Sequence, residues 1–291
     1  AIDPGNKHCQ TCTCETKKMT RNERFVDTHH HQAPCGVPIA EFDPTPFPPP
    51  LPEPEYSVRR RLLSPATVAL SSSEGRLRLM NALSQNTAAS YFALTQHAMN
   101  QSEPAYCAIT TAVIVLNALE CDSVFRWKGG WRYWSENVLI ACCPCLDDVR
   151  VQRSGVTVTE FQRLVTCHGL KSTFKRPQLR QGTRESGYSL ADFRTDVQRI
   201  LSDNDGDDNT GVLVVSFSRQ ALGQTGEGHF SPVAAYDVGS DSVLVIDVAR
   251  YKYPWYWVRL EDLYRALQPA DPVTNQPRGW YLIYKPKASQ G

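Results

Sequence analysis

Cys107 stands where a polar stretch, "NQSEPAY", meets the apolar run "AITTAVIVLNAL" at residues 108–119. A run of this length that is apolar on nearly every side predicts a buried helix, with Cys107 in its first turn. Unpaired backbone N–H groups and the positive end of the helix dipole would then face the sulfur and lower the pKa of the thiol. Cys107 is therefore a candidate nucleophile, although a cysteine beside an apolar run is more often a small buried hydrophobic residue.

His229 and Asp247 could activate that thiol. His229 follows three nearby glycines in "GQTGEGHFSPV", at the start of an expected strand, where a substrate can come close to the backbone. Asp247 comes 18 residues later in "VLVIDVAR", flanked by apolar residues on the expected adjacent strand. A carboxylate buried there needs a partner, and His229 is the natural one. The three residues would supply a nucleophile, a base and an orienting carboxylate.

Gln101, six residues before Cys107, could complete such a site. Its side-chain N–H and the backbone N–H of Cys107 would form an oxyanion hole. The chemistry that these residue types predict together is acyl transfer.

The elements expected to position these residues are helices first and strands later. Helices are predicted for "SSSEGRLRLMNAL", where apolar residues recur at Leu77, Leu79, Met80 and Leu83, and for "NTAASYFALTQHAMN", "GVTVTEFQRLVTCHG", "SLADFRTDVQRIL" and "LEDLYRAL". Strands are predicted for "GVLVVSFS", for "FSPVAAYDV" and "VLVIDVAR" on either side of a turn, and for "GWYLIYK". This order predicts an α+β fold with an antiparallel sheet.

Composition argues against several classes of protein. The 31 Lys and Arg residues nearly balance 30 Asp and Glu, so no basic excess points to nucleic acid. No apolar run reaches the roughly 18 to 20 residues that cross a bilayer, and no signal-peptide pattern opens the chain. Ten cysteines, several crowded in "CQTCTC" and "CCPC", favour reduced thiols over a disulfide framework. We therefore expect a soluble, cytoplasmic protein whose partner is a small molecule or peptide; a targeting segment removed before Ala1 would leave no trace.

Residues 1–55 are expected to be a largely disordered extension, because "DPTPFPPPLPEPE" can neither continue a helix nor donate ladder hydrogen bonds. A catalytic domain is expected over residues 56–285 and a short tail over residues 286–291. The extension also holds side chains that could bind a soft metal, although their spacing fits no zinc template well. These side chains are Cys9, Cys12, Cys14 and His29 to His31.

Six motifs in order, "QSEPAYC", "VLNAL", "WKGGWR", "QTGEGHFSPV", "DVARYKYP" and "RGWYLI", resemble the catalytic domain of phytochelatin synthase, a papain-like cysteine transpeptidase. The resemblance runs from about Tyr56 to Lys285. It implies a helical N-terminal lobe carrying the nucleophile and an antiparallel β-sheet lobe carrying the histidine and aspartate. In the implied reaction the cysteine attacks the Cys-Gly bond of glutathione, glycine leaves, and γ-Glu-Cys passes to another glutathione or a phytochelatin. No organic cofactor is implied; heavy-metal ions such as Cd²⁺ or Zn²⁺ would activate as glutathione thiolates, and related enzymes form homodimers.

The resemblance also implies a role for each matching residue. Cys107 becomes the acylated nucleophile, His229 the base and then acid, and Asp247 its orienter, with Gln101 as oxyanion donor. Asp271 and Arg278 match positions that hold the γ-glutamyl group. Positions suspected of receiving the second substrate are matched by Arg219, Arg250, Lys252 and Tyr253, and the remaining predicted substrate-binding residues are Glu103 and Gly228. Cys142 and Cys143 match a vicinal pair thought to sense or hold metal, and reduced thiols on a loop are an equally good interpretation.

Some features depart from the family and leave alternatives open. Ala108 replaces the glycine that commonly follows the nucleophile, which puts rate and acceptor preference in doubt, and Cys145 is an extra thiol. The same acyl-enzyme could pass to water, which would make the protein a glutathione or glutathione-conjugate deglycylase; the retained Arg250 and Tyr253 favour transfer. A third hypothesis is a thiol-rich metal-binding protein with a vestigial triad.

Overall fold

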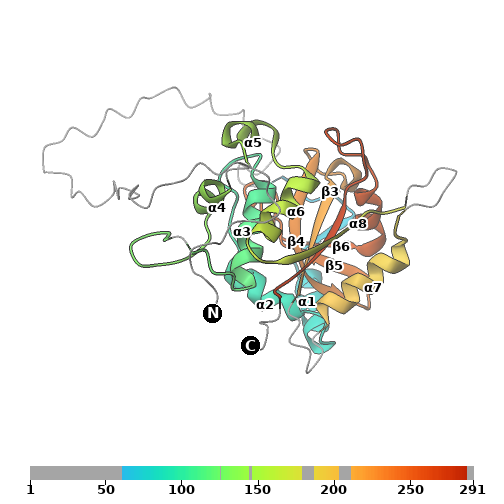
Figure 1. Ribbon diagram of the computed structural model, residues 1–291. Helices are drawn as coiled ribbons and strands as arrows, with labels where there is room; N and C mark the ends of the chain where they lie inside the picture. Colours follow the sequence, from blue (N-terminus) through green and yellow to red (C-terminus); the bar gives the residue numbers. More distant parts are fainter. Residues whose placement is uncertain (1–60, 125, 144–145, 179–186, 203–210, 287–291) are drawn as a thin grey trace, which may run out of the picture.

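The computed structural model describes residues 61–124, 126–143, 146–178, 187–202 and 211–286 (Figure 1). The predicted extension, its cysteines and histidines, and Cys145 lie outside these ranges. The helices are α1 (Ser73–Ser84), α2 (Ala89–Gln96), α3 (Cys107–Ala118), α4 (Glu136–Cys142), α5 (Asp148–Ser154), α6 (Val158–Cys167), α7 (Leu190–Leu201), the 3₁₀-helix η1 (Gln220–Leu222) and α8 (Leu260–Leu267). The strands are β1 (Thr67–Ala69), β2 (Lys171–Lys175), β3 (Gly211–Ser218), β4 (Gly228–Asp237), β5 (Ser242–Val245), β6 (Tyr256–Arg259) and β7 (Gly279–Tyr284). In these ranges no helix is long and apolar enough to span a bilayer.

The strands form one antiparallel sheet in the order β1-β6-β5-β4-β3-β7-β2. The predicted α+β class with an antiparallel sheet is confirmed. The sequence did not predict β1, β2 and β6, and it also missed the short helices α4 and α5. Since β1 comes from the N-terminal half of the chain and forms one edge, the sheet is not built from the C-terminal half alone.

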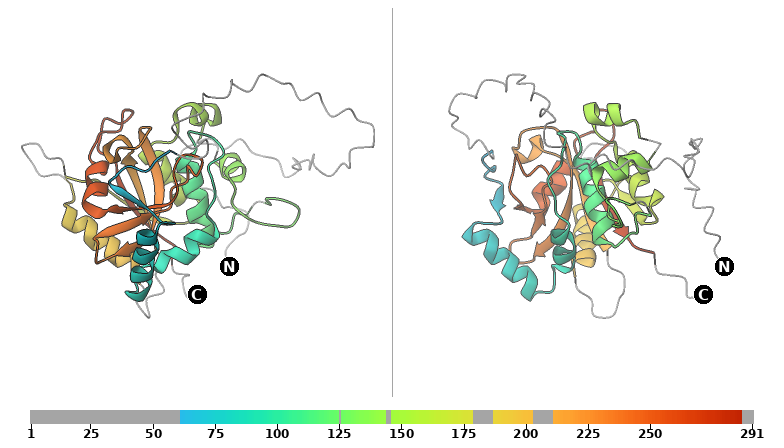
Figure 2. Two further views of the ribbon diagram at one scale, coloured as in Figure 1. Left: turned by 180° about the vertical axis from the view of Figure 1, so that it is seen from behind. Right: turned by 90° about the vertical axis from the view of Figure 1, so that its left-hand side faces the viewer.

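Helices cover both faces of this sheet. Val212 and Val214 of β3 pack with α3 and α6, whereas Leu213 and Val215 of the same strand pack with α7 and α8. The right-hand view of Figure 2 shows the green helices on one side of the orange strands. Because both faces are covered, β3 reads as a continuous apolar run and lacks the polar alternation of a sheet that faces water.

Helix α3 carries the nucleophile candidate, and its prediction as a buried helix is confirmed. Every residue from Ala108 to Ala118 is buried. Its polar side chains have partners: the Thr111 hydroxyl donates to the Phe230 carbonyl at 3.2 Å, and the Asn117 amide donates to the Trp134 carbonyl at 2.9 Å. These bonds avoid the cost of unsatisfied buried groups, and the first of them fixes α3 against β4 next to His229.

Helix α1 forms where it was predicted, but of the apolar residues that predicted it only Leu79 packs against the core, and Leu77, Met80 and Leu83 are exposed. Leu77 and Met80 are 56% and 65% exposed, while Gly75 and Ala82 are buried. The reason is close packing, since a Cβ on Gly75 would lie 2.0 Å from the carbonyl oxygen of Ala69. Only small residues fit between α1 and the neighbouring chain.

Candidate active site

Cys107 is the first residue of α3, as predicted, and is partly exposed. Burial of its sulfur raises the pKa of the thiol, while the backbone N–H groups of Phe230 and Ala108 and the charge of Arg219 act in the opposite direction. The expected lowering of this pKa by the helix start is therefore wrong for the resting structure, because desolvation outweighs the helix end. The contact with Phe230 places the sulfur beside the residue that follows His229.

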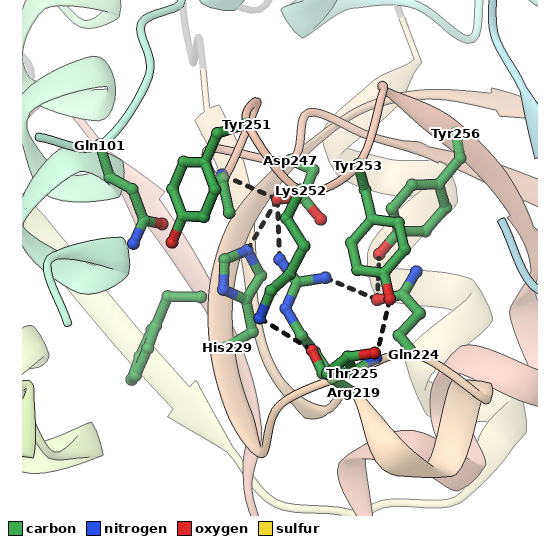
Figure 3. A network of polar contacts seen from close by, with 12 residues as sticks. Gln101, Arg219, Gln224, Thr225, His229, Asp247, Tyr251, Lys252, Tyr253 and Tyr256 are labelled. Carbon is green, nitrogen blue, oxygen red and sulfur yellow. Dashed lines mark hydrogen bonds and ion pairs between the residues drawn. The ribbon is translucent and has the colours of Figure 1, made fainter. Parts of the chain in front are cut away.

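His229 is the second residue of β4 and is 3% exposed. Its Nε2 lies 3.0 Å from Oδ1 of Asp247 (Figure 3). Burial lowers the pKa of this imidazole to about 4; Arg219 acts in the same direction and Asp247 against it. At neutral pH the ring is uncharged and donates from Nε2 to the carboxylate, which leaves Nδ1 as the basic nitrogen.

Asp247 lies two residues beyond the end of β5, not within the strand as expected. Its side chain takes part in a local turn, because Oδ1 accepts the backbone N–H of Ala249 at 2.9 Å. The same oxygen accepts from Nη2 of Arg219 at 2.9 Å and from His229. Burial alone would raise the pKa of this carboxyl, but His229 and Arg219 outweigh burial and hold it well below its usual range. The predicted pairing of a buried aspartate with His229 is what the structure contains.

Gln101 is 2% exposed, and its backbone N–H donates to the carbonyl of Val248 at 2.9 Å. This bond joins the polar loop before α3 to the residue next to Asp247. Its side-chain Nε2 donates to the carbonyls of Glu103 and Pro104, both at 2.8 Å. Gln101 can serve an oxyanion only if one of those bonds is given up, so its donor role stays a prediction.

A buried acid that sequence reasoning missed anchors this loop. Glu136 begins α4, is 5% exposed, and accepts hydrogen bonds from the hydroxyls of Ser102 and Thr110 and from the Ser102 backbone N–H at 3.3 Å. It thereby ties the loop, α3 and α4 together. The sequence signal was an acid directly after Ser135, an N-cap residue, which is ordinarily a solvated first-turn charge.

Arg278 lies against Gly228, the residue before His229, and Asp271 lies near Arg278; their role in binding stays a prediction. Arg278 is 3% exposed, and its Nη1 donates to the carbonyls of Pro269 and Ala270 at 3.0 and 2.8 Å. Its Nη2 reaches only 3.9 Å from Asp271 Oδ2, and its Nε is buried with no partner in the part of the chain described. A Cβ on Gly228 would lie 3.0 Å from Nη2, so the guanidinium rests directly against that glycine. The unpartnered Nε and the weakly held Nη2 are the donors that a bound carboxylate would use.

The four residues expected around a second substrate differ in their accessibility. Arg219 and Tyr253 are each 2% exposed; the Arg219 guanidinium lies over the Tyr253 ring at 5.1 Å, and the Tyr253 hydroxyl accepts the N–H of Thr225. Lys252 is less buried, and its Nζ donates to the Thr225 carbonyl at 3.0 Å. Arg250 lies over the Trp255 ring at 4.6 Å. The structure therefore leaves Lys252, but neither Arg219 nor Tyr253, in reach of solvent.

Glu103 is exposed in the loop before α3. It lines a pocket of about 280 Å³ together with Ser102, Tyr106 and residues of α4 and α5. The side chain is thus accessible to a ligand, and its predicted part in substrate binding stays a prediction.

Cys142 ends α4 and Cys143 follows it, in different surroundings. Cys143 is 2% exposed and its sulfur lies 3.2 Å from Nε2 of His168, a pairing that the sequence did not predict. Burial raises the pKa of the Cys142 thiol to about 12 and lowers that of His168 to about 4. Among the residues described, no three His, Cys, Asp or Glu side chains gather to hold a metal ion. Two donors fall short of the usual tetrahedral set, so no catalytic step is derived through a resident metal.

A thiol at a helix start, next to an imidazole that a buried carboxylate orients, is the arrangement of cysteine-dependent hydrolases and acyltransferases. Residues 58–280 match the family model described as phytochelatin synthase. The chain therefore belongs to the phytochelatin synthase family.

Curated relatives agree with this assignment. The chain is 37% identical over 227 residues to the glutathione gamma-glutamylcysteinyltransferase of Schizosaccharomyces pombe, covering 78% of this chain and 51% of the relative. It is 38% identical to glutathione gamma-glutamylcysteinyltransferase 3 of Lotus japonicus, covering 79% and 44%, and 36% identical to glutathione gamma-glutamylcysteinyltransferase 1 of Arabidopsis thaliana, covering 80% and 45%. The chain thus spans about half the length of the relatives it matches. A structural match to a double glycine motif protease from an AMS/PCAT transporter has a TM-score of 0.36 and 14% identity, covering 65% of this chain and 91% of the protease.

Proposed function

We propose that this chain is a γ-glutamylcysteine dipeptidyltransferase, which removes glycine from glutathione and transfers γ-Glu-Cys to another glutathione or to a phytochelatin. One observation carries the proposal: a thiol, an imidazole oriented by a carboxylate, and an arginine with free donors meet at the start of β4. The shared family and the names of the relatives support the same substrate. The papain-like fold implied by the resemblance belongs to this proposal as well.

Acylation begins from a neutral pair, because burial keeps the Cys107 thiol protonated and the His229 imidazole uncharged. His229 Nδ1 accepts the thiol proton as the sulfur attacks the carbonyl carbon of the Cys-Gly bond. Asp247 stabilises the imidazolium that forms. The Cys107 backbone N–H, joined by Gln101 if its amide turns, stabilises the oxyanion. The imidazolium then gives its proton to the departing glycine nitrogen, and a γ-Glu-Cys thioester remains on Cys107.

Recognition of the γ-glutamyl group falls to Arg278 and Asp271. The Nε and Nη2 donors of Arg278 suit the α-carboxylate, and Asp271, whose side chain is 19% exposed, suits the ammonium. Arg278 rests against Gly228, the residue before His229, so the group bound there would present its amide chain toward Cys107.

Transfer reverses the proton movements. The α-amine of a second glutathione attacks the thioester carbon while His229 takes its proton, and the proton returns to the Cys107 sulfur as the C–S bond breaks. Heavy-metal ions such as Cd²⁺ or Zn²⁺ enter as the thiolate of glutathione, that is, as part of the substrate.

The test is incubation of the protein with glutathione, with and without Cd²⁺, followed by mass analysis of products. Oligomers of γ-Glu-Cys ending in glycine are expected from the wild-type chain, and none from Cys107→Ser. Cys121→Ser, which removes a partly exposed thiol of the same chain, is the matched control and should keep activity. Free γ-Glu-Cys as the sole product would replace transfer by hydrolysis. Glycine release that survives Cys107→Ser would refute the triad, and unchanged metal binding without any glycine release would favour a metal-binding protein.

A further inference from the structure

Arg219 lies behind the candidate catalytic residues and is not used by the mechanism above. It directly follows β3, and its backbone N–H donates to the Glu227 carbonyl at 2.8 Å, which closes the loop that leads back to His229. Its side chain turns inward to Asp247, as Figure 3 shows. With 2% exposure, this guanidinium is among the deepest charges described in the protein.

Both terminal nitrogens of Arg219 are used within the protein. Nη2 donates to Asp247 Oδ1 at 2.9 Å, and Nη1 donates to Gln224 Oε1 at 2.6 Å. Gln224 is itself 4% exposed, and the Tyr253 ring lies against the guanidinium at 5.1 Å. The guanidinium is held at two nitrogens and at one face, so it has a single orientation and neither terminal nitrogen points toward solvent.

Three donors therefore converge on one carboxylate oxygen. Arg219, His229 and the Ala249 backbone N–H all lie 2.9 to 3.0 Å from Asp247 Oδ1. His229 alone would leave the carboxylate free to rotate about its bond to Cβ. The guanidinium and the backbone donor remove that freedom, and with it the freedom of the imidazole.

The charges around the reacting pair come from several elements. His229 faces Asp247, Arg219 and Lys252, and the Cys107 sulfur faces Arg219 and Asp247. Tyr251, on the loop after Asp247, lies within electrostatic reach of Arg219, Cys107 and Asp247. Removal of Arg219 leaves Asp247 unopposed near both members of the pair, which favours the protonated imidazole and disfavours the thiolate.

We propose that Arg219 is a positioning residue that fixes the Asp247 carboxylate against His229, and that it contacts neither glutathione molecule. The proposal rests on the acyl-transfer function proposed for Cys107, His229 and Asp247. It differs from the role in second-substrate binding that the family resemblance implies for the same residue.

The test compares Arg219→Gln, which removes the charge, with Arg219→Lys. Lysine keeps the charge but cannot donate from two terminal nitrogens to Gln224 and Asp247 at once. Arg194→Gln is the matched control, because it removes an arginine–aspartate pair, to Asp241 at 2.7 Å, elsewhere in the fold. Three quantities are measured: the rate of glycine release with its KM, the ratio of transfer to hydrolysis products, and the pH dependence of Cys107 alkylation by iodoacetamide. The alkylation needs no glutathione, so it tests Arg219 even if the wild-type chain releases no glycine and the proposed function fails.

For Arg219→Gln we expect glycine release about 10- to 100-fold slower, an unchanged KM and product ratio, and an alkylation profile about one pH unit higher. Arg219→Lys should restore the alkylation profile but not the full rate, and Arg194→Gln should match the wild type in all three. A normal rate of glycine release with a lower transfer ratio would overturn the proposal in favour of acceptor contact. If the Arg219 variants do not fold, Gln224→Leu, which removes the partner of Arg219 Nη1, must show the same changes in smaller degree. A wild-type alkylation profile for Gln224→Leu would also overturn the proposal.

Discussion

Gly228→Ala should weaken glutathione binding without unfolding the protein. A Cβ at this position would lie 3.0 Å from Nη2, 3.3 Å from Nε and 3.5 Å from Cζ of Arg278. The closest of these contacts is about half an ångström shorter than ordinary van der Waals contact, so the guanidinium must retreat. It cannot swing away freely, because its Nη1 is bonded to the carbonyls of Pro269 and Ala270.

The size of the effect on glutathione binding follows from the hydrogen bonds that displacement of the Arg278 guanidinium would lengthen. A charge-assisted hydrogen bond contributes roughly 1.5 to 3 kcal/mol, and partial loss of one to a bound carboxylate costs about 1 to 2 kcal/mol. That corresponds to a KM for glutathione about 5- to 30-fold higher, with kcat affected less, because the interaction is present in both ground and transition states. Gly228 does not have a positive φ, so alanine adopts its backbone without strain, and the free energy of unfolding should change by less than about 1 kcal/mol.

The assay is steady-state glycine release over a range of glutathione concentrations, with urea unfolding of the same samples. Gly130→Ala serves as the control, because a Cβ there meets no atom of the described residues within 4 Å and the residue lies in an exposed turn. A KM for Gly228→Ala equal to that of the control would refute the assignment of Arg278 to the substrate carboxylate.

Two further predictions concern stability. Burial holds the pKa of His229 and His168 at about 4, below the 6.5 of a free imidazole, so between these pH values the unfolded chain binds protons that the folded chain does not. The free energy of unfolding should therefore fall as the pH drops from 6.5 toward 4, by up to about 3 kcal/mol for each histidine; equal urea midpoints at pH 7 and pH 5 would contradict this. Glu136→Gln replaces a buried carboxylate that accepts from Ser102 and Thr110, so it should cost about 2 kcal/mol in urea unfolding and slow glycine release; an unchanged midpoint would show that the anchor is unimportant.

Local patterns in the sequence predicted the elements that carry the chemistry. The apolar run after Cys107 has one stable solution, a buried helix, because no face of it is suited to water. The β-branched run at residues 211–218 likewise reads as a strand, and an aspartate among apolar residues at Asp247 demands a partner. These conclusions depend on neighbours in the chain, which is why sequence alone could reach them and pair Asp247 with His229. The family resemblance then added the binding roles expected for Asp271 and Arg278.

Only the tertiary structure decided how those residues behave. Whether a thiol at a helix start is activated depends on how completely other elements desolvate it, and for Cys107 desolvation prevails over the helix end. The same holds for charges whose sequence context suggests a solvated surface. Arg219 is buried against Asp247 and Tyr253, and Glu136 is buried against Ser102 and Thr110 of α3. Residue type and spacing determined which groups this protein brings to its site, whereas burial, which depends on distant parts of the chain, determined their charge, their partners and what each can do.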